Sequence, residues 1–384
     1  SGRDRGSERP YPAVQGNEQV NLTVGFKPPP TVAMTTPTVP GGDQEEVDVT
    51  VKADDQGGGI GEIRLYHNEK LVAATTRGIG IITDPTAAKV ASMTYHVRLV
   101  QGENRLRAIA ISTERIEGNP AEFLVTFNGV EKQPVLHVAV VGINQYRNST
   151  LNLNFAEPDA SAVLGFFSSA SPKLFRSVQK SQLMNGNATR IDVISKLQSL
   201  KNTAPNDVVI VYLAGHGESS GSNWYFLPHD VVYPERADEL RTKGVSSQEI
   251  RDLVMQIGAK KVLLLMDACK SGFALQAFST RGVDERRALA QLAHANGIHL
   301  VAASSKDQFA SEVQELGHGV FTYTLLKGLK GEADGSPKDG VVTVRELLAF
   351  VESQLPELSL KYRTQRQYPV AQSQGMDFPL AMNK

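Results

Sequence analysis

The sequence has a single cysteine, Cys269, among 384 residues, so it holds no intrachain disulfide and no cysteine-rich zinc site. Its apolar runs, such as Val262–Met266, have the length of a strand and fall far short of the ~20 residues that a membrane-spanning helix requires. Lysine and arginine number 40 against 41 aspartate and glutamate residues, so no net field favours nucleic acid or anionic lipid. We therefore expect a soluble protein without a membrane span, for which nucleic acid is not a partner.

The amino-terminal stretch also lacks features. Residues 1–17 are polar, rich in glycine, proline and arginine, and contain no apolar core of a secretory signal. The first residue is serine rather than methionine. We expect a disordered segment over 1–17, a native N-terminus that begins further upstream, and a cytoplasmic location.

Residues 18–128 carry the pattern of an all-β region. Short segments alternate apolar and polar residues, and stretches rich in glycine and proline separate them without a helical pattern between. Four of these segments are Val47–Val51, Glu62–Tyr66, Thr94–Leu99 and Arg105–Ile111. The pattern predicts an immunoglobulin-like β-sandwich. A short linker follows at residues 129–135.

From residue 136 to residue 384 the pattern is that of an α/β domain. Leu136–Ile143, Val208–Leu213 and Lys261–Met266 are nearly continuous apolar runs, and helical periodicities lie between them. Strands of this kind are buried on both faces, so we predict a mainly parallel sheet with helices on each side. In such sheets the chemistry gathers at the carboxyl ends of the strands.

Two of those strand ends carry reactive side chains. Val208–Leu213 runs into Ala214-Gly215-His216-Gly217, and the next apolar strand runs into Asp267-Ala268-Cys269-Lys270-Ser271-Gly272. A cysteine nucleophile needs a base that takes the thiol proton, and flanking glycines let a substrate backbone approach. We predict a Cys269–His216 pair. The alternative is that Cys269 is a buried small hydrophobe and His216 an ordinary loop residue.

These two motifs resemble the histidine and cysteine motifs of the caspase-like cysteine peptidases, in particular their bacterial and metacaspase-type branch. The cysteine lies 269 − 216 = 53 residues after the histidine, similar to the caspase arrangement. The resemblance extends from about Leu136 to Leu380. It includes Asp159-Ala160 and the segments Ser305–Glu312 and His318–Lys330.

The resemblance implies a cysteine endopeptidase that works through an acyl-enzyme. Cys269 would attack the scissile carbonyl and His216 would be the acid–base group. The backbone N–H groups of Cys269 and Gly217 would form the oxyanion hole, in which such donors contribute several kcal/mol. The sequence offers no assured third member of a triad.

The resemblance also suggests what precedes the cut. In metacaspase-like members, an aspartate two residues before the cysteine and another after the first strand line that pocket, and Asp267 and Asp159 match these positions. Two carboxylates in a poorly hydrated cleft favour a cation, and arginine pairs with carboxylate bidentately. We predict cleavage after arginine and, less readily, lysine. Asp307 matches a further segment near the cleft, although it could equally be a solvated loop acid, as Asp159 could be a simple helix-terminal acid.

Two polar segments, Val231–Gly244 and Phe273–Arg287, look like basic loops. If the pocket is acidic, they are candidates for self-cleavage, and Arg281, Arg286 and Arg287 are the favoured positions. Asp334 and Asp339 only loosely resemble a divalent-ion loop, so no calcium site is readable and we expect no cofactor or metal.

Two other functions remain open from the sequence. The chain could be a catalytically silent scaffold with a caspase-like fold, although keeping both His216 and Cys269 argues against that. It could also be a switch that cleaves only itself or one partner. In each case the expected partners are proteins or peptides, and the β region would position the peptidase or recruit a sensor protein.

Overall fold

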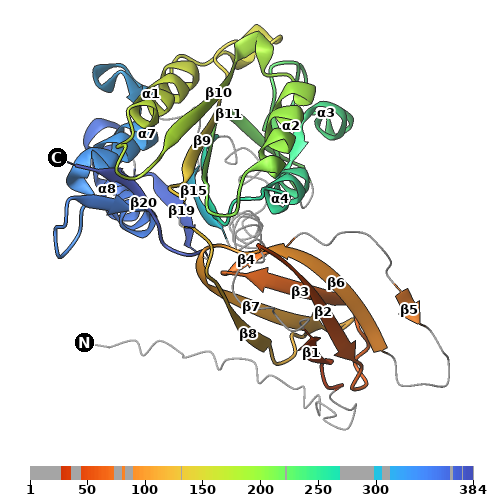
Figure 1. Cartoon of the computed structure of the whole chain (residues 1–384). Helices are drawn as coiled ribbons and strands as arrows, with labels where there is room; N and C mark the ends of the chain where they lie inside the picture. Colours follow the sequence, from red (N-terminus) through yellow and green to blue (C-terminus); the bar gives the residue numbers. More distant parts are fainter. Residues whose placement is uncertain are drawn as a thin grey trace, which may run out of the picture.

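The computed structural model describes residues 27–35, 45–72, 80–82, 90–130, 132–220, 223–268, 298–304, 312–363, 366–373 and 375–383. The chain forms an amino-terminal β region and a carboxyl-terminal α/β region (Figure 1). Cys269, Asp307 and the three arginines favoured for self-cleavage lie outside the described residues.

The β region consists of two antiparallel sheets, ordered β1-β2-β6-β5 and β4-β3-β7-β8. Alternate residues of β2 are buried, as its alternating sequence requires. Val49 on β2, Leu65 on β3 and Leu106 on β7 belong to one core, so the two sheets pack face to face. The all-β prediction is confirmed, and the immunoglobulin-like label stays a prediction. The strands are β1 (Thr31–Thr35), β2 (Glu46–Asp54), β3 (Glu62–His67), β4 (Lys70–Leu71), β5 (Gly80–Ile82), β6 (Val90–Arg98), β7 (Gly102–Ile111) and β8 (Ala121–Phe127).

The α/β region is built on a sheet of order β10-β9-β11-β14-β15-β19. All neighbours are parallel except β15 and β19. The apolar strands β9, β11 and β14 lie at its centre and are buried almost throughout, which confirms the predicted mainly parallel sheet. The strands are β9 (Val135–Gly142), β10 (Ser177–Met184), β11 (Val208–Ser220), β14 (Lys261–Ala268), β15 (His299–Ser304) and β19 (Tyr368–Ser373).

Helices cover both faces of this sheet. Helices α1, α7 and α8 lie on one side and α2, α3 and α4 on the other (Figure 1). Capping boxes begin two of them, formed by Thr189 with Asp192 and by Ser246 with Glu249, and this fixes where the sequence turns helical. The helices are α1 (Ala156–Ser168), α2 (Arg190–Ser199), α3 (Ala237–Lys243), α4 (Ser247–Met255), α7 (Val320–Lys327) and α8 (Val344–Arg363).

Short elements complete the region. Strand β12 folds back on β11 and pairs with β13, β16 pairs with β17, and β18 pairs with β20. Their bounds are β12 (Asn223–Leu227), β13 (Val245–Ser246), β16 (Glu312–Val313), β17 (His318–Gly319), β18 (Val341–Thr343) and β20 (Pro379–Met382). The helical turns are η1 (Ser149–Leu151), η2 (Asn185–Asn187), η3 (Leu200–Asn202), η4 (Gln314–Leu316) and η5 (Gly328–Glu332).

The β region docks on the α/β region through a buried lysine. Lys70 on β4 donates from Nζ to the carbonyl oxygens of Ile257 and Ala259, which lie between α4 and β14; the Ala259 bond measures 2.9 Å. Met255 at the end of α4 packs on an apolar cluster of the β region that includes Leu71. This contact lies at the beginning of β14, at the amino ends of the parallel strands.

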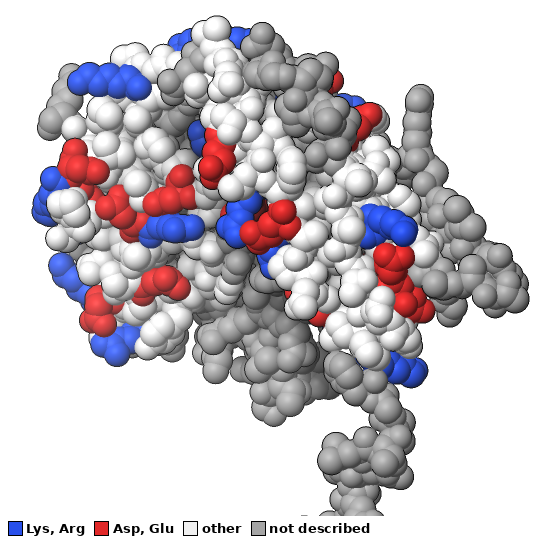
Figure 2. All heavy atoms as spheres, turned by 60° about the horizontal axis from the view of Figure 1, so that its bottom comes forward, with Lys and Arg blue, Asp and Glu red and all other residues white. Residues whose placement is uncertain are grey.

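Charge is evenly mixed where it is visible. Figure 2 turns the β-region end toward the viewer, and acidic and basic side chains of the described residues lie interspersed on that face. Among the described helices, none is long and apolar enough to cross a membrane.

Candidate active site

His216 lies where β11 leaves the parallel sheet. Up to Gly215 the strand pairs in parallel with β14, and Gly215 is opposite Ala268. From His216 onward it pairs antiparallel with β12 instead. The sequence predicted that the strand ends at Leu213, but it continues to Ser220 because the residues after His216 form the first arm of a hairpin. The candidate base therefore stands on a strand rather than in a loop.

Three contacts fix His216. The side chain is buried, with 1% of the residue exposed, and its Nε2 donates to the carbonyl oxygen of Leu151 at 2.8 Å. Its backbone N–H donates to the hydroxyl of Tyr146 at 2.8 Å, and the two rings lie 5.2 Å apart. A carbonyl oxygen only accepts, so Nε2 carries the proton in neutral imidazole and Nδ1 is the nitrogen that can accept one. The backbone carbonyl of Leu151 thus holds the imidazole in this orientation.

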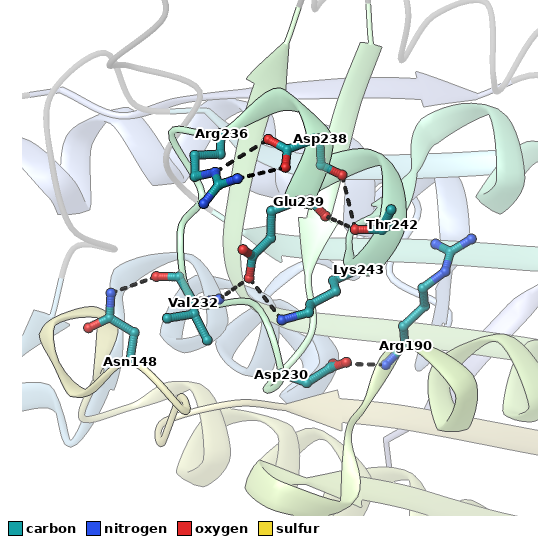
Figure 3. Close-up of polar contacts among 9 residues, drawn as sticks. All are labelled: Asn148, Arg190, Asp230, Val232, Arg236, Asp238, Glu239, Thr242 and Lys243. Atoms are coloured by element: carbon teal, nitrogen blue, oxygen red, sulfur yellow. Dashed lines mark hydrogen bonds and ion pairs between the residues drawn. The ribbon is translucent and has the colours of Figure 1, made fainter.

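The carbonyl of Leu151 belongs to a turn that asparagines hold in place. Asn148 caps η1 by accepting from the N–H of Thr150 at 3.1 Å, and Asn152 accepts from the N–H of Tyr146 at 2.8 Å. Asn148 also donates to the carbonyl of Val232 at 2.7 Å (Figure 3). The turn that orients His216 is thus attached to the segment before α3.

That segment was predicted to be a polar loop, and the structure corrects this. Residues 237–243 form α3, and the ion pairs Arg236–Asp238 and Lys243–Glu239 lie along it (Figure 3). Glu239 also accepts from the N–H of Val232 at 2.7 Å, which closes the segment on itself. The acidic residues of the first turn and the basic residues of the last complement the helix dipole, which the loop reading overlooked.

Asp159 is a buried acid in the first turn of α1. Only 2% of the residue is exposed. Its Oδ1 lies 2.7 Å from Nδ1 of His318, and its Oδ2 accepts from the N–H of Gly319 at 3.0 Å. Asp159 is therefore not a solvated helix-terminal acid, and its role in substrate binding stays a prediction.

Asp267 is the penultimate residue of β14 and is 6% exposed. Its Oδ2 accepts from the hydroxyls of Thr322 at 2.9 Å and Tyr212 at 3.3 Å. Burial, reinforced by the charge of Asp159, raises the pKa of Asp267 to about 7. Burial and the charge of Asp267 likewise raise the pKa of Tyr212, so the phenol stays neutral.

The two carboxylates meet at Gly319, the residue before α7. A Cβ at this glycine would lie 2.9 Å from Oδ2 of Asp159 and 3.5 Å from Oδ2 of Asp267. A side chain here would crowd Asp159, whereas its contact with Asp267 would be an ordinary van der Waals contact. The structure thus brings together two acids that are 108 residues apart in the sequence (267 − 159).

Gly217, the oxyanion candidate, lies in the hairpin opposite Phe226. A Cβ there would come within 2.4 Å of the Trp224 ring, which is 5% exposed. The close packing of backbone and indole explains the glycine.

The loop that loosely resembled an ion site has another explanation. Asp334 accepts from the N–H of Asp339 at 3.2 Å through Oδ1 and from that of Gly340 at 3.0 Å through Oδ2. Both oxygens therefore serve the turn itself. Over the described part of the chain, no three histidine, cysteine or acidic side chains gather as metal ligands.

The sequence did not single out four groups of this site: His318, Tyr212, Thr322 and the carbonyl of Leu151. Tyr212 carried a signal, because it lies two residues before Ala214, which pairs with Asp267, and alternate residues share a face. The backbone carbonyl carries no sequence signal. His318 and Thr322 lie in the segment His318–Lys330 that the resemblance included, although neither residue was assigned a role.

The fold and the paired motifs define an α/β protein with a histidine and buried acids at the carboxyl edge of its sheet. Residues 136–380 match the family model described as the caspase domain. The chain belongs to the caspase-domain family, and this makes it a cysteine peptidase by family.

No curated protein matches the chain. Among solved structures, the chain matches the fibronectin(III)-like modules of CbhA from Clostridium thermocellum. The identity is 16% and the TM-score 0.19, and the match covers 26% of this chain and 97% of the CbhA chain.

Proposed function

We propose that the protein is a cysteine endopeptidase with Cys269 as nucleophile and His216 as acid–base group. One observation carries the proposal. Gly215 pairs with Ala268 on adjacent parallel strands, and His216 and Cys269 are the residues that follow this pair in the sequence. Paired strands lie about 4.8 Å apart, so the sheet itself supports close approach of the two residues.

The chemistry follows from the orientation of His216. With Nε2 engaged by the Leu151 carbonyl, Nδ1 takes the thiol proton of Cys269, and the thiolate sulfur bonds to the scissile carbonyl carbon. The resulting oxyanion accepts from the N–H groups of Cys269 and Gly217. The imidazolium then returns its proton to the leaving amine as the C–N bond breaks. Water, deprotonated by the same imidazole, hydrolyses the acyl-enzyme. No metal or cofactor is needed.

Asp267 and Asp159 support cleavage after a basic residue, with arginine preferred over lysine. Two buried carboxylates attract a cation and penalise an acidic side chain by like-charge repulsion. Both described hydrogen bonds to Asp267 end on Oδ2, which leaves Oδ1 as the oxygen through which it would bind a guanidinium. Asp307 remains a further candidate at the same pocket.

The test is turnover of fluorogenic peptides that end in arginine, lysine or aspartate. Wild type should release the fluorophore after arginine, and Cys269→Ala and His216→Ala should abolish this release. His96→Ala, an exposed histidine of the β region, is the matched control and should retain full activity. Arginine turnover that persists in Cys269→Ala would contradict the proposal.

Self-processing is a second proposal, and one observation reduces the number of candidate cleavage sites. Of the two basic segments, the one around Arg236 is folded into α3 and its ion pairs, whereas a peptidase binds its substrate extended. Cleavage at Arg281, Arg286 or Arg287 is then the expected event. Mass spectrometry of the active protein would show new termini at these residues, and an intact chain in an active preparation would rule the event out.

A silent scaffold predicts an inert thiol. Cys269 paired with His216 would react quickly with iodoacetamide at about pH 6, because pairing lowers a thiol pKa. A slow reaction would favour the scaffold.

A further inference from the structure

Asp159, one of the two buried acids, is already paired with a histidine of the protein, His318. Nδ1 of His318 lies 2.7 Å from Oδ1 of Asp159, whose side chain is only 3% exposed, whereas that of His318 is 27% exposed. His318 sits on the two-residue strand β17, opposite Val313 of β16. Its imidazole therefore reaches a buried acid from a solvent-accessible position.

The groups facing this pair come from five elements. Asp159 stands on α1, Asp267 on β14 and His318 on β17, while neutral hydroxyls come from Tyr212 on β11 and Thr322 on α7. Among the described residues of the cluster, the imidazole is the single group that can carry positive charge. It offsets one of the two negative charges that would attract a basic substrate.

The acceptor oxygens of Asp159 are also engaged. Oδ1 faces the imidazole and Oδ2 accepts from the N–H of Gly319. A guanidinium that reached Asp159 would have to take the place of His318 at Oδ1, because a backbone N–H is fixed and an accessible side chain can rotate away. Asp267 presents no such competitor within the described residues.

We propose that His318 is a specificity-determining residue, whose imidazole competes with the basic side chain preceding the scissile bond for the carboxylate of Asp159. This deepens the proposed function and rests on it. Asp267 is then the primary anchor of the substrate cation, and Asp159 becomes available only when the imidazole leaves.

Two consequences follow. A protonated imidazole competes more strongly than a neutral one, so basic substrates bind more weakly at low pH than at high pH. Removal of the competitor benefits arginine more than lysine, because the planar guanidinium fork can engage two carboxylates whereas an ammonium is a point charge.

The test compares wild type with His318→Ala and His318→Asn between about pH 5.5 and about pH 8.5. Alanine removes both the donor and the charge. Asparagine keeps an N–H donor near the position of Nδ1 but does not titrate. His96→Ala, exposed on the β region, is the matched control. KM and kcat are measured for paired peptides ending in arginine and lysine.

The proposal predicts that His318→Ala lowers KM for the arginine peptide about fivefold at about pH 6, as expected for a partly exposed ion pair, with little change of kcat. The ratio of the wild-type to the variant KM falls toward one by about pH 8.5. The arginine gain exceeds the lysine gain. In His318→Asn the KM relative to His318→Ala is independent of pH.

A higher KM in His318→Ala at every pH would overturn the proposal, because His318 would then merely support Asp159. An unchanged KM ratio across the pH range would overturn it as well. With either of these results, arginine turnover by wild type would still support the proposed function. Cleavage after aspartate would contradict both the role of His318 and the proposed preference for basic residues.

A binding measurement tests the same proposal if the purified enzyme is latent and does not turn over peptides. In Cys269→Ala protein, the imidazole signals of His318 are followed by NMR while agmatine, a soluble guanidinium, is added. The proposal predicts that saturating agmatine shifts these signals, because the imidazole loses its contact with the carboxylate of Asp159. Signals that stay unchanged at saturation, with binding verified by calorimetry, would contradict it.

Discussion

The molecule buries two clusters of titratable side chains, one acidic and one basic, at opposite edges of one sheet. Asp159 and Asp267 lie at the carboxyl edge, beside the histidine of the candidate site. Lys70, Lys260 and His67 lie at the amino edge, where the β region docks. Burial disfavours charge in both, and it therefore raises the pKa of Asp267 and lowers those of the basic groups. The difference lies in what each cluster is built to meet.

In the basic cluster, the amine of Lys70 is hydrogen-bonded within the protein. Nζ of Lys70 donates to two carbonyl oxygens, and a neutral amine has two N–H donors to give. Burial, and then the charge of Lys260, lowers the pKa of Lys70; burial lowers the pKa of Lys260 to about 8. Burial and the neighbouring lysine charges hold the pKa of His67 at about 3, and its Nε2 bonds Asn104 at 2.8 Å. These groups hold two regions of the chain together.

The acid cluster keeps a partly accessible partner, His318, and it includes Asp267, which precedes the proposed nucleophile by two residues in the sequence. The two edges are separated by the length of β14, eight residues or about 25 Å. The β region therefore contacts the α/β region far from the carboxyl edge of the sheet. We expect the acid cluster to govern activity and the basic cluster to govern stability.

The largest effect is expected from Asp267→Asn. Loss of the charge that would pair with the substrate cation in a buried pocket should lower kcat/KM for an arginine peptide about 10²- to 10³-fold. The free energy of unfolding should stay the same or rise, because one of two coupled carboxylates is gone. Peptide kinetics and urea unfolding check this, with exposed Asp252→Asn on α4 as control. A stability loss as large as the activity loss would break the comparison.

Lys70→Ala should do the reverse. It leaves the carbonyls of Ile257 and Ala259 without their donor and opens a cavity, so the free energy of unfolding should fall by about 2–4 kcal/mol. Limited proteolysis should separate the β region from the α/β region sooner. The folded fraction of the Lys70→Ala variant should cleave peptides at the wild-type rate. Lys52→Ala, an exposed lysine of the same region, is the control and should change neither.

A smaller effect is expected from Gly319→Ala. The new Cβ would lie 2.9 Å from Oδ2 of Asp159, so that carboxylate or the start of α7 must shift. Misplacement of one acid should cost about tenfold in kcat/KM, seen mainly in KM. Gly165→Ala, on α1 with open space around its Cβ position, is the control. Unchanged kinetics in Gly319→Ala would mean that the spacing of the two acids does not matter.

The smallest effect is a pair of opposite pH slopes. Asp267 has a raised pKa in the folded protein, so its contribution to stability is complete below about pH 4 and is lost as the pH rises through about 7. Lys260 has a lowered pKa, so its contribution is complete above about pH 10.4 and is lost as the pH falls through about 8.

Unfolding free energies from about pH 4 to about pH 10.5 test these slopes. Asp267→Asn should flatten the acid window alone, and Lys260→Met the alkaline window alone. A single variant that altered both windows would show that the clusters are coupled through the sheet.

The sequence predicted the acid edge better than the basic one. Apolar strands that end in motif residues predicted the parallel sheet and placed Asp267 at a strand end, and the resemblance singled out Asp159. The docking contact had no such signal. Lys70 follows Asn68 and Glu69, whose positive φ values make a hairpin turn without glycine, and a lysine after a turn reads as exposed. Its burial depends on a second region that sequence patterns do not position.

The site shows the same limit on a smaller scale. His216 was predicted from its motif, while the carbonyl that orients it comes from η1, whose position depends on Asn148 and Asn152. His318 approaches Asp159 from a strand of two residues, which is too short to leave a periodic pattern. Contacts that arise between distant segments, or from the backbone, have no local pattern to predict them.

The most direct test of the central claim uses a library of peptides derived from a proteome. The library is incubated with wild type and with Cys269→Ala, and the residue before each new cut is identified by mass spectrometry. The account predicts cuts after arginine, fewer after lysine, and none with Cys269→Ala. Cuts predominantly after aspartate would contradict the role of the buried acid pair.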